Sequence, residues 1–376
     1  MSLLHEIWLC EVCKYEPEII YKFLNFFGSA EEAHKAKKSK YKKSEFFSSL
    51  TRILNADKSL DQAKSLVEEC ERKGIHIMSY HDEDYPIYLK NGYLPPRLLF
   101  IKGERLNLND YILITIVGSR ASTRQGRQMA NQLGKDLAEN GIIVVSGMAR
   151  GVDTEAHLGA LDGGGKTIAF LAGGVDLVYP PENRKLYENI IENGAVISER
   201  PPGTPGRDYY YQRRNRIMAS VANGIVVVEG TSQSGTSITV KHATDASRDL
   251  FAVPGNPILS PSELPNGLIR DGVTTVLSYE DILNTYRETY PKKLENGLKL
   301  VKPKEESIAV DLGYELDEDD KKIINYLKDF GEGQYPDDIA ESCDLPIQKV
   351  SSKLTMLMIG GIVTQEPGNK YLLTRR

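Results

Sequence analysis

The sequence predicts an α/β protein: a Rossmann-like, doubly wound and mainly parallel sheet, with an N-terminal helical domain and a C-terminal winged-helix domain. The principal observation is a series of short apolar segments between residues 112 and 254, which alternate with polar segments of helix length. Strands that are apolar on both faces and alternate with helices indicate a parallel sheet covered on both sides. The other observations are helical periodicity in residues 1–75, and three helical segments and a hairpin after residue 315.

Length and composition limit the class of protein. A chain of 376 residues favours two or three domains, and 40% hydrophobic residues are enough for a sizeable core. No apolar segment approaches the ~20 residues that span a bilayer, and the N-terminus lacks the basic region and cleavage site of a signal peptide. We therefore expect a cytoplasmic protein without a membrane segment. The net charge of −5 excludes nucleic-acid binding through bulk positive charge, so such a site must be a local patch.

Residues 1–75 are predicted to form an N-terminal helical, SAM-like domain. Cys10-x-x-Cys13 invites a metal or redox interpretation, but one pair lacks the other ligands of a structural zinc, and its apolar neighbours favour a buried helix. The run from Lys35 to Lys43 is either a solvated loop or an arm that contacts DNA, and the loop is favoured.

The remaining chain divides where the amino-acid composition and the hydrophobic pattern change. Residues 76–106, punctuated by prolines, are predicted to be an extended connector with short strands. The Rossmann-like domain follows over 107–287. A charged stretch without helical periodicity, 288–314, is predicted to be a linker, and 315–376 the winged-helix domain. The strands expected in the Rossmann-like domain are 112–117, 142–146, 167–172, 195–198, 225–229 and 250–254.

Two turns at the ends of these strands are candidate anion sites. Ligands of parallel sheets bind beyond the carboxyl ends of the strands. The first strand ends in Gly118-Ser119-Arg120, whose backbone N–H groups and guanidinium suit a phosphate; the alternative is a tight turn with a surface arginine. The fifth strand ends in a run of small hydroxyl residues and glycine at 229–237, which predicts a second anion nest.

Catalysis has one candidate pair. Asp153 and His157 are four residues apart, so they lie on one face of a helix and suggest general base chemistry. A structural role is favoured, in which Asp153 stabilises the helix N-terminus and His157 packs, because no nucleophile or metal set accompanies them. The fingerprints G-x-G-x-x-G and G-x-x-x-x-G-K-[ST] are absent. We therefore expect no cofactor, no metal and no catalytic residue.

Aromatic and cationic residues gather before the fifth strand. Three tyrosines, 209–211, precede Arg213, Arg214, Asn215 and Arg216. Rings on which bases stack, cations for phosphates and an amide for base edges are the parts of a site for single-stranded nucleic acid. The alternative is a solvated basic helix start with tyrosines used for packing.

These motifs resemble the DNA-processing protein family DprA (Smf). IVGSR (116–120), VVSGMARGVDTEAH (144–157), RRNRIMA (213–219), SGTSIT (234–239) and FAVPGN (251–256) stand in the order seen in that family. The resemblance implies a cytoplasmic, non-enzymatic protein of natural transformation. Such proteins bind and protect incoming single-stranded DNA, form homodimers through the Rossmann-like domain, and help to load the RecA recombinase.

The predicted DNA site follows from the residues and the resemblance together. Its members share a position at a turn beyond a strand or in the tyrosine- and arginine-rich segment 209–216. They are Gly118, Ser119, Arg120, Gly147, Arg150, Gly173, Gly174, Tyr211, Arg213, Arg214, Asn215, Arg216, Ser234, Gly235 and Thr236.

The sequence departs from the family in three places. Tyr15–Glu18 stand where many members have a Gly-rich hairpin, and Tyr211-Gln212 replace the usual Phe-Pro. Residues 315–376 contain 12 Asp and Glu against 8 Lys and Arg, whereas a winged helix that reads DNA should be basic. Two other functions use this kind of sheet: a nucleotide-phosphate hydrolase, whose PGGxGTxxE signature is absent, and a scaffold that senses one mononucleotide.

Overall fold

Nine strands form one sheet in the first of two units into which the chain divides, Met1–Pro303 and Lys304–Arg376. The structure, a computed structural model, describes residues 2–37, 55–302, 316–330, 333–359, 362–366 and 368–373. The strand order is β1-β2-β6-β5-β4-β3-β7-β8-β9. The strands are β1 (Ile75–Ser79), β2 (Leu98–Gly103), β3 (Leu113–Val117), β4 (Ile143–Ser146), β5 (Thr167–Phe170), β6 (Gly194–Ser198), β7 (Gly224–Val227), β8 (Asp249–Ala252) and β9 (Thr274–Thr275).

The prediction of a mainly parallel α/β sheet is confirmed. From β6 to β9 every neighbouring pair is parallel, and β1 and β2 add an antiparallel ribbon at the β6 edge. That ribbon makes part of the expected connector an integral part of the sheet. Each of the six expected apolar segments overlaps a strand, because strands covered on both faces are rich in apolar side chains.

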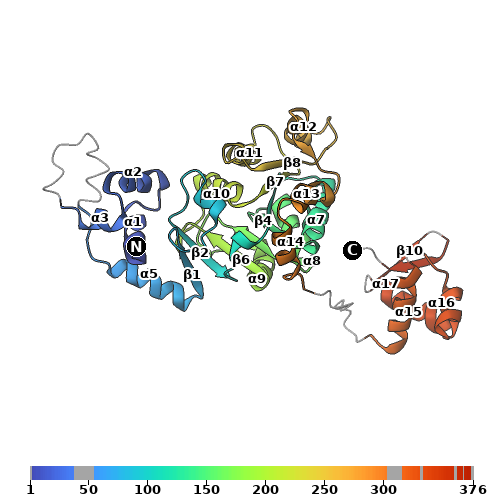
Figure 1. Ribbon diagram of the computed structural model, residues 1–376. Helices are drawn as coiled ribbons and strands as arrows, with labels where there is room; N and C mark the ends of the chain where they lie inside the picture. The colour runs from blue at the N-terminus through green and yellow to red at the C-terminus, as the bar shows by residue number, and fades with distance from the viewer. Residues whose placement is uncertain are drawn as a thin grey trace. The chain divides into compact units, whose positions relative to one another are not determined.

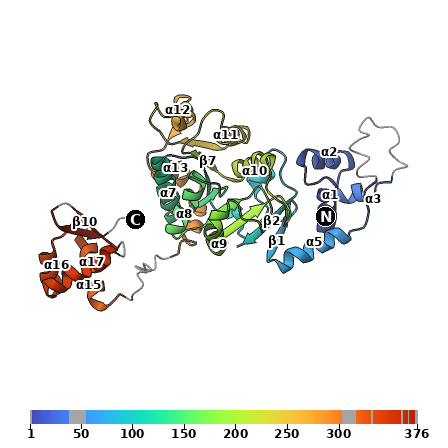
Figure 2. The same cartoon turned by 180° about the vertical axis from the view of Figure 1, so that it is seen from behind.

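Helices cover both faces of the sheet (Figures 1 and 2). Ile114 and Ile116 point to a core with one set of helices, and Leu113 and Val117 to a core with the other, as the alternation along a strand requires. The first set is α7 (Arg124–Glu139), α8 (Val152–Asp162), α13 (Tyr279–Arg287) and α14 (Pro291–Leu298), and the second is α10 (Asp208–Val221) and α11 (Gly235–Asp245).

The chain reverses its direction across the sheet at β3. Strands β4, β5 and β6 lie successively on one side of β3, and β7, β8 and β9 on the other. The loops that leave β3 and β7 therefore turn to opposite faces and open a crevice between them. Ligands bind at this switch point in open α/β sheets.

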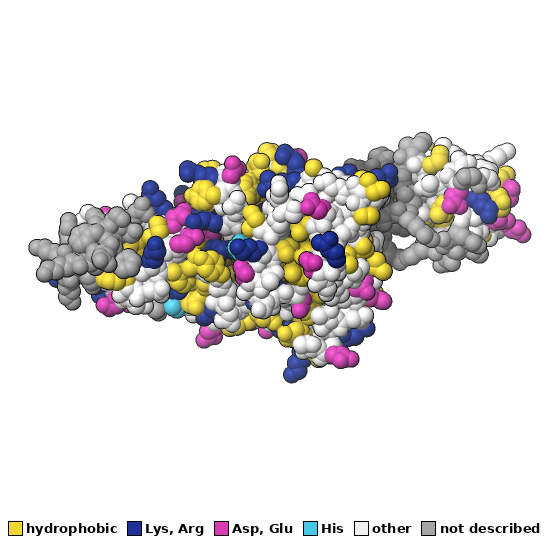
Figure 3. Space-filling model, turned by 90° about the horizontal axis from the view of Figure 1, so that it is seen from above, with side chains coloured by type: hydrophobic (Ala, Val, Ile, Leu, Met, Phe, Trp, Pro, Cys, Tyr) yellow, Lys and Arg dark blue, Asp and Glu magenta, His cyan; other side chains and the backbone are white. Residues whose placement is uncertain are grey.

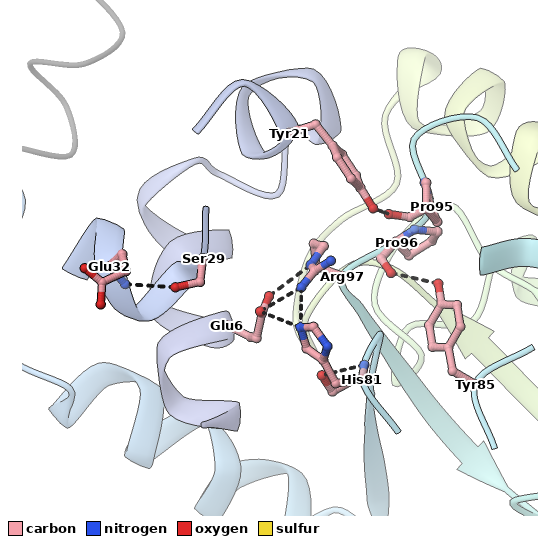
Figure 4. A network of polar contacts seen from close by, with 10 residues as sticks. Glu6, Tyr21, Ser29, Glu32, His81, Tyr85, Pro95, Pro96 and Arg97 are labelled. Carbon is pink, nitrogen blue, oxygen red and sulfur yellow. Dashed lines mark hydrogen bonds and ion pairs between the residues drawn. The ribbon is translucent and has the colours of Figure 1, made fainter. Parts of the chain in front are cut away.

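The N-terminal helices α1 (Leu3–Val12), α2 (Pro17–Phe27), α3 (Ala30–Lys35) and α5 (Asp61–Arg72) pack on the first unit's sheet through a shared apolar core. A buried ion pair joins α1 to the start of β2. Arg97 donates to both carboxylate oxygens of Glu6, at 3.0 and 2.7 Å, and His81 Nε2 lies 2.7 Å from the Arg97 Nη2 (Figure 4). Burial, with the Arg97 charge as the second cause, lowers the pKa of His81.

The prediction of an irregular linker over 288–314 is wrong for its first part. Helix α14 packs against the turn before β4, where the Gly141 carbonyl leaves no room for a side chain on Gly297. Lys302 N–H donates to the Gly164 carbonyl at 2.9 Å. The periodicity is hard to see because Leu294 and Gly297 are the buried positions of this short helix. The domain divisions at 75 and 106 stay predictions.

In its described residues, the second unit has three helices and a two-stranded antiparallel sheet, the order of elements that was predicted. They are α15 (Glu318–Phe330), α16 (Pro336–Cys343), α17 (Ile347–Ile359), β10 (Val363–Glu366) and β11 (Lys370–Leu373), around an apolar core of their own. Lys353 pairs with Asp317 and Asp320 at 2.5 and 3.0 Å, and Lys349 pairs with Asp319. Both cations of helix α17 thus have acidic partners. That this unit is a winged helix stays an interpretation.

Other expectations concern single segments. Cys10 and Cys13 are buried at the end of α1, as predicted, and burial raises the pKa of the Cys10 thiol. Within the described ranges no group of His, Cys, Asp and Glu is arranged to hold a metal. None of the helices in the described ranges has the length and apolarity that a bilayer crossing needs. The lysine run falls largely outside the described residues, which end at 37 and resume at 55.

Candidate nucleic-acid interface

A pocket of about 580 Å³ lies at the switch point, between the loops that follow β3 and β7 and the start of α10. We call it the switch-point pocket. Its lining includes nine of the predicted site residues, Gly118, Ser119, Arg120, Tyr211, Arg214, Asn215, Ser234, Gly235 and Thr236. Helices α7, α8, α10 and α11 all begin at this edge, where helix N-termini favour negative charge.

The loop after β3 brings backbone close to the pocket because Gly118 has no side chain. A Cβ there would lie 2.6 Å from the Val152 side chain and 3.0 Å from the Glu229 carbonyl. Ser119 Oγ accepts the N–H of Ala121 at 3.1 Å, which fixes the turn. The next side chain, Arg120, is exposed and reaches over the pocket.

Arg120 lies against the ring of Tyr211. Its guanidinium carbon is 5.0 Å from the ring centroid, a cation–π distance. In the part of the chain that the structure describes, Arg120 has no acidic partner, unlike Arg150, Arg213 and Arg216. An exposed planar cation next to a half-buried ring can bind a phosphate while the ring receives a base.

The loop after β7 contributes the N-terminus of α11. Gly235 opens this helix, and no atom lies within 4 Å of the position where its Cβ would be. The first N–H groups of a helix have no partner inside the helix, so this end can bind an anion. Asn215 joins α10 to this turn, because its Nδ2 donates to the Gly235 carbonyl at 3.2 Å.

Arg214 lines the pocket, but its guanidinium makes structural hydrogen bonds to the backbone. It is only 5% exposed, and its Nη1 donates to the carbonyls of Gly147 and Phe170 at 2.7 and 2.6 Å. Burial lowers the pKa of Arg214, and Asp153 opposes that shift. Arg214 therefore connects α10 to the ends of β4 and β5.

Two of the three predicted arginines on α10 lie outside the pocket. Arg216 is buried, pairs with Glu199 and donates to the Leu94 carbonyl at 2.7 Å. Arg213 pairs with Glu16 and Glu18 of the N-terminal helices at 2.8 and 3.0 Å. The sequence could not separate these roles. Successive residues of a helix point about 100° apart, so neighbouring arginines reach different partners.

The other predicted residues outside the pocket lining have supporting positions or lie beyond its rim. Gly147 leaves room for the Arg214 guanidinium, and Gly173 and Gly174 leave room for the backbone of 201–206. Gly174 N–H donates to the Thr204 carbonyl at 2.8 Å. Arg150, in the loop after β4, has a 57% exposed side chain that pairs with Glu182.

Asp153 and His157 have separate structural roles, as was favoured. Asp153 Oδ2 accepts the N–H groups of Gly147 and Ala149 at 3.2 and 3.4 Å. His157 is fully buried, and its Nδ1 lies 2.7 Å from Thr167 Oγ1, which donates its own proton to the Val144 carbonyl. Nδ1 of His157 is therefore the donor, and burial lowers the pKa of this histidine to about 3.

Sequence reasoning missed several residues of the lining. Gln212, Gln233 and Thr239 add polar groups, and Asp208 adds an exposed carboxylate at the start of α10. Gln212 and Gln233 stand directly beside predicted residues, so their position along the chain was the available signal. Asp208 gave none, because an acid at a helix start is explained by the helix dipole alone.

The charge on the protein surface agrees with a local site. Figure 3 shows Lys and Arg side chains scattered among acidic and hydrophobic ones on the face seen from above, without one broad basic field. A larger pocket of about 690 Å³ lies on the α7 side of β7, but its lining contains the acid Glu229 and no Lys or Arg. Of these two pockets, the switch-point pocket is therefore better suited to phosphates.

Comparisons with known proteins identify the family of this chain. The family model described as DNA recombination-mediator protein A matches residues 76–287. The DNA processing protein DprA of Bacillus subtilis is 36% identical over 216 residues, which cover 57% of this chain and 73% of that protein. Protein Smf of Escherichia coli is 32% identical over 312 residues, 81% of this chain and 79% of that protein.

Solved structures give the same result. The X-ray structure of DNA processing protein A from Streptococcus pneumoniae superposes with a TM-score of 0.62 at 30% identity, over 75% of this chain and 98% of that one. A structure from Helicobacter pylori, described as giving insights into the unique single-stranded DNA binding mode of its DNA processing protein A, has a TM-score of 0.51 and 26% identity. It covers 57% of this chain and all of the other.

Proposed function

This chain belongs to the DNA recombination-mediator protein A family, and on that premise we propose that it binds single-stranded DNA at the switch-point pocket. We further propose that it protects incoming strands in natural transformation and helps to load the RecA recombinase onto them. The observation that carries the DNA site is the pairing of Arg120 with Tyr211, an exposed cation on a ring at a crevice lined by helix N-termini.

The site suits a single strand better than a duplex. A duplex hides the faces of its bases in the stack and is read by a helix or ribbon that enters a groove. In the first unit the cations near the pocket lie at loop ends and helix starts, and Arg213, Arg214 and Arg216 have protein partners. Ring faces beside backbone N–H groups instead fit splayed bases and an accessible phosphate, without preference for sequence.

A hydrolase is less well supported. General base chemistry would need Asp153 or His157 to face the pocket with its proton acceptor free. Asp153 lines the pocket, but its Oδ2 is already engaged by two backbone N–H groups. His157 packs between α8 and β5 with a strongly lowered pKa. We infer that the family's role in this chain is binding, and that nucleotides incubated with it remain unchanged with or without Mg²⁺.

The partners follow from family membership more than from any one surface. We propose a homodimer and a contact with RecA. The first is tested by the mass in solution at micromolar concentration, and the second by RecA-dependent strand exchange in the presence and absence of the protein. A monomer at all concentrations, or strand exchange that the protein leaves unchanged, would contradict the respective proposal.

The length of the ligand separates the DNA-binding function from a mononucleotide sensor. Fluorescence anisotropy with labelled oligothymidylates of increasing length should show affinity that rises until the strand fills the site, because each added base finds a ring or a cation. Thymidine monophosphate should compete poorly. Affinity that is the same for the mononucleotide and for long strands would support the sensor and contradict the proposal.

A further inference from the structure

One exposed aromatic side chain lies at the rim of the switch-point pocket and has no role in the core. Tyr179, in the loop between β5 and α9 (Arg184–Glu192), is 53% exposed. Its ring centroid lies 6.0 Å from that of Tyr211, and the two ring planes are inclined by 55°. The loop leaves the carboxyl end of β5, so Tyr179 stands on the same edge of the sheet as Arg120.

Arg150, in the loop after β4, interacts with Tyr179. Its guanidinium pairs with Glu182, and this pair is the main cause of the raised pKa of Arg150, with the Tyr179 hydroxyl as a further contributor. Arg120 contacts Tyr211, and Tyr211 contacts Tyr179. Because Tyr179 also interacts with Arg150, the four side chains form a connected series of cation, ring, ring and cation.

We propose that Tyr179 is a second stacking platform, which receives the base next to the one on Tyr211, and that Arg150 binds the adjoining phosphate. This inference rests on the proposed function and extends its site by one nucleotide. Consecutive bases rise by about 3.4 Å along a duplex strand and move further apart when splayed. Inclined rings 6.0 Å apart match separate bases better than one continuous stack.

Glu182 then competes with the phosphate of the DNA for the guanidinium of Arg150. Both side chains of the Arg150–Glu182 pair are more than half exposed, and exposed ion pairs contribute little to stability. Exchange of the Glu182 carboxylate for a phosphate therefore costs little free energy. Removal of the Glu182 charge should free Arg150 and strengthen DNA binding, whereas removal of the Tyr179 ring should weaken it. The two substitutions thus have opposite expected signs.

The experiment measures binding of a labelled oligothymidylate to the full chain and five variants. Tyr179→Ala and Tyr179→Leu should lose about 5- to 150-fold in affinity, the range for one stacked base, while Tyr179→Phe should bind as the unaltered chain does. Tyr209→Ala is the matched control. Tyr209 is 41% exposed on the same helix as Tyr211, but it lies against Tyr210 and donates to Glu16.

A strand with abasic sites in place of bases separates stacking from a structural effect. On that strand the loss caused by Tyr179→Ala should disappear, because there is no base to stack, whereas damage to the fold would persist on both strands. Glu182→Gln should raise affinity at low salt, and the gain should shrink as salt screens the charge.

Two results would overturn the inference. One is binding by Tyr179→Ala and Tyr179→Leu equal to that of the unaltered chain, and the other is a loss that is the same on abasic and ordinary strands. Both leave the proposed function intact if the unaltered chain binds the strand. Failure of the unaltered chain to bind would instead overturn the proposed function, and the inference with it.

Discussion

The guanidinium of Arg214 occupies the space beside the α-carbon of Gly147 and donates to the Gly147 carbonyl at 2.7 Å. A Cβ on Gly147 would lie 1.9 Å from Arg214 Nη1. The end of β4 and the start of α10 therefore fit together only while residue 147 has no side chain. This contact places Tyr211, one helical turn earlier on α10, at the crevice.

Gly147→Ala should displace Arg214, leave the Phe170 carbonyl without its donor and weaken both the fold and DNA binding. We expect a loss of about 1–3 kcal/mol in the free energy of unfolding, as for other overpacked sites, and weaker binding of single strands. Urea denaturation and anisotropy measure the two effects. Gly267→Ala is the control, because it is a helical glycine with no atom within 4 Å of the Cβ position. Unchanged stability of Gly147→Ala would contradict the tight fit.

Arg216→Ala should destabilise the chain without removing a DNA contact. Arg216 and Glu199 form a buried pair, and removal of one member of such a pair costs about 3–5 kcal/mol, because the other charge stays buried. The folded fraction should keep its affinity for single strands. Arg216→Met combined with Glu199→Leu should regain much of the stability. A stable Arg216→Ala variant with a tenfold loss of affinity would show that Arg216 contacts DNA.

Three neighbouring arginines show which part of this site the sequence could predict and which part it could not. The sheet was predictable, because buried parallel strands such as β3 must be apolar on both faces, and the turn at Gly118 follows from its place after a strand. Arg213, Arg214 and Arg216 were predicted as one DNA-binding group. The helix directs them to an N-terminal acid pair, to backbone carbonyls and to Glu199, and only the tertiary structure contains that information.

Burial of His157 predicts a loss of stability in mild acid. The pKa of His157 is about 3 in the folded chain, against about 6.5 when unfolded. Below pH 6.5 the unfolded state therefore binds a proton that the folded state does not. Stability should fall by up to ~1.4 kcal/mol per pH unit between pH 6.5 and 5 from this group alone. His157→Gln, which can still donate to Thr167, should flatten the dependence measured by urea denaturation. An equal slope in the variant would show that other groups cause it.

Deletion of residues 315–376 should leave the affinity for single strands nearly unchanged. The segment has a net negative charge, and the two lysines of α17 have acidic partners. The measurement is anisotropy with the truncated chain, whose fold is checked by circular dichroism. A loss of tenfold or more, ~1.4 kcal/mol, in a folded truncation would show that the second unit contributes to DNA binding.

The most direct test of the DNA site compares single-stranded and duplex oligonucleotides of one length, with the unaltered chain and Arg120→Ala, at about 0.15 M salt. The account predicts that single strands bind much more tightly than duplex. It also predicts that Arg120→Ala weakens single-strand binding by roughly 1–3 kcal/mol and lowers the salt slope by about one. Equal affinity for both forms, or an unchanged isotherm for Arg120→Ala, would contradict the assignment of the switch-point pocket.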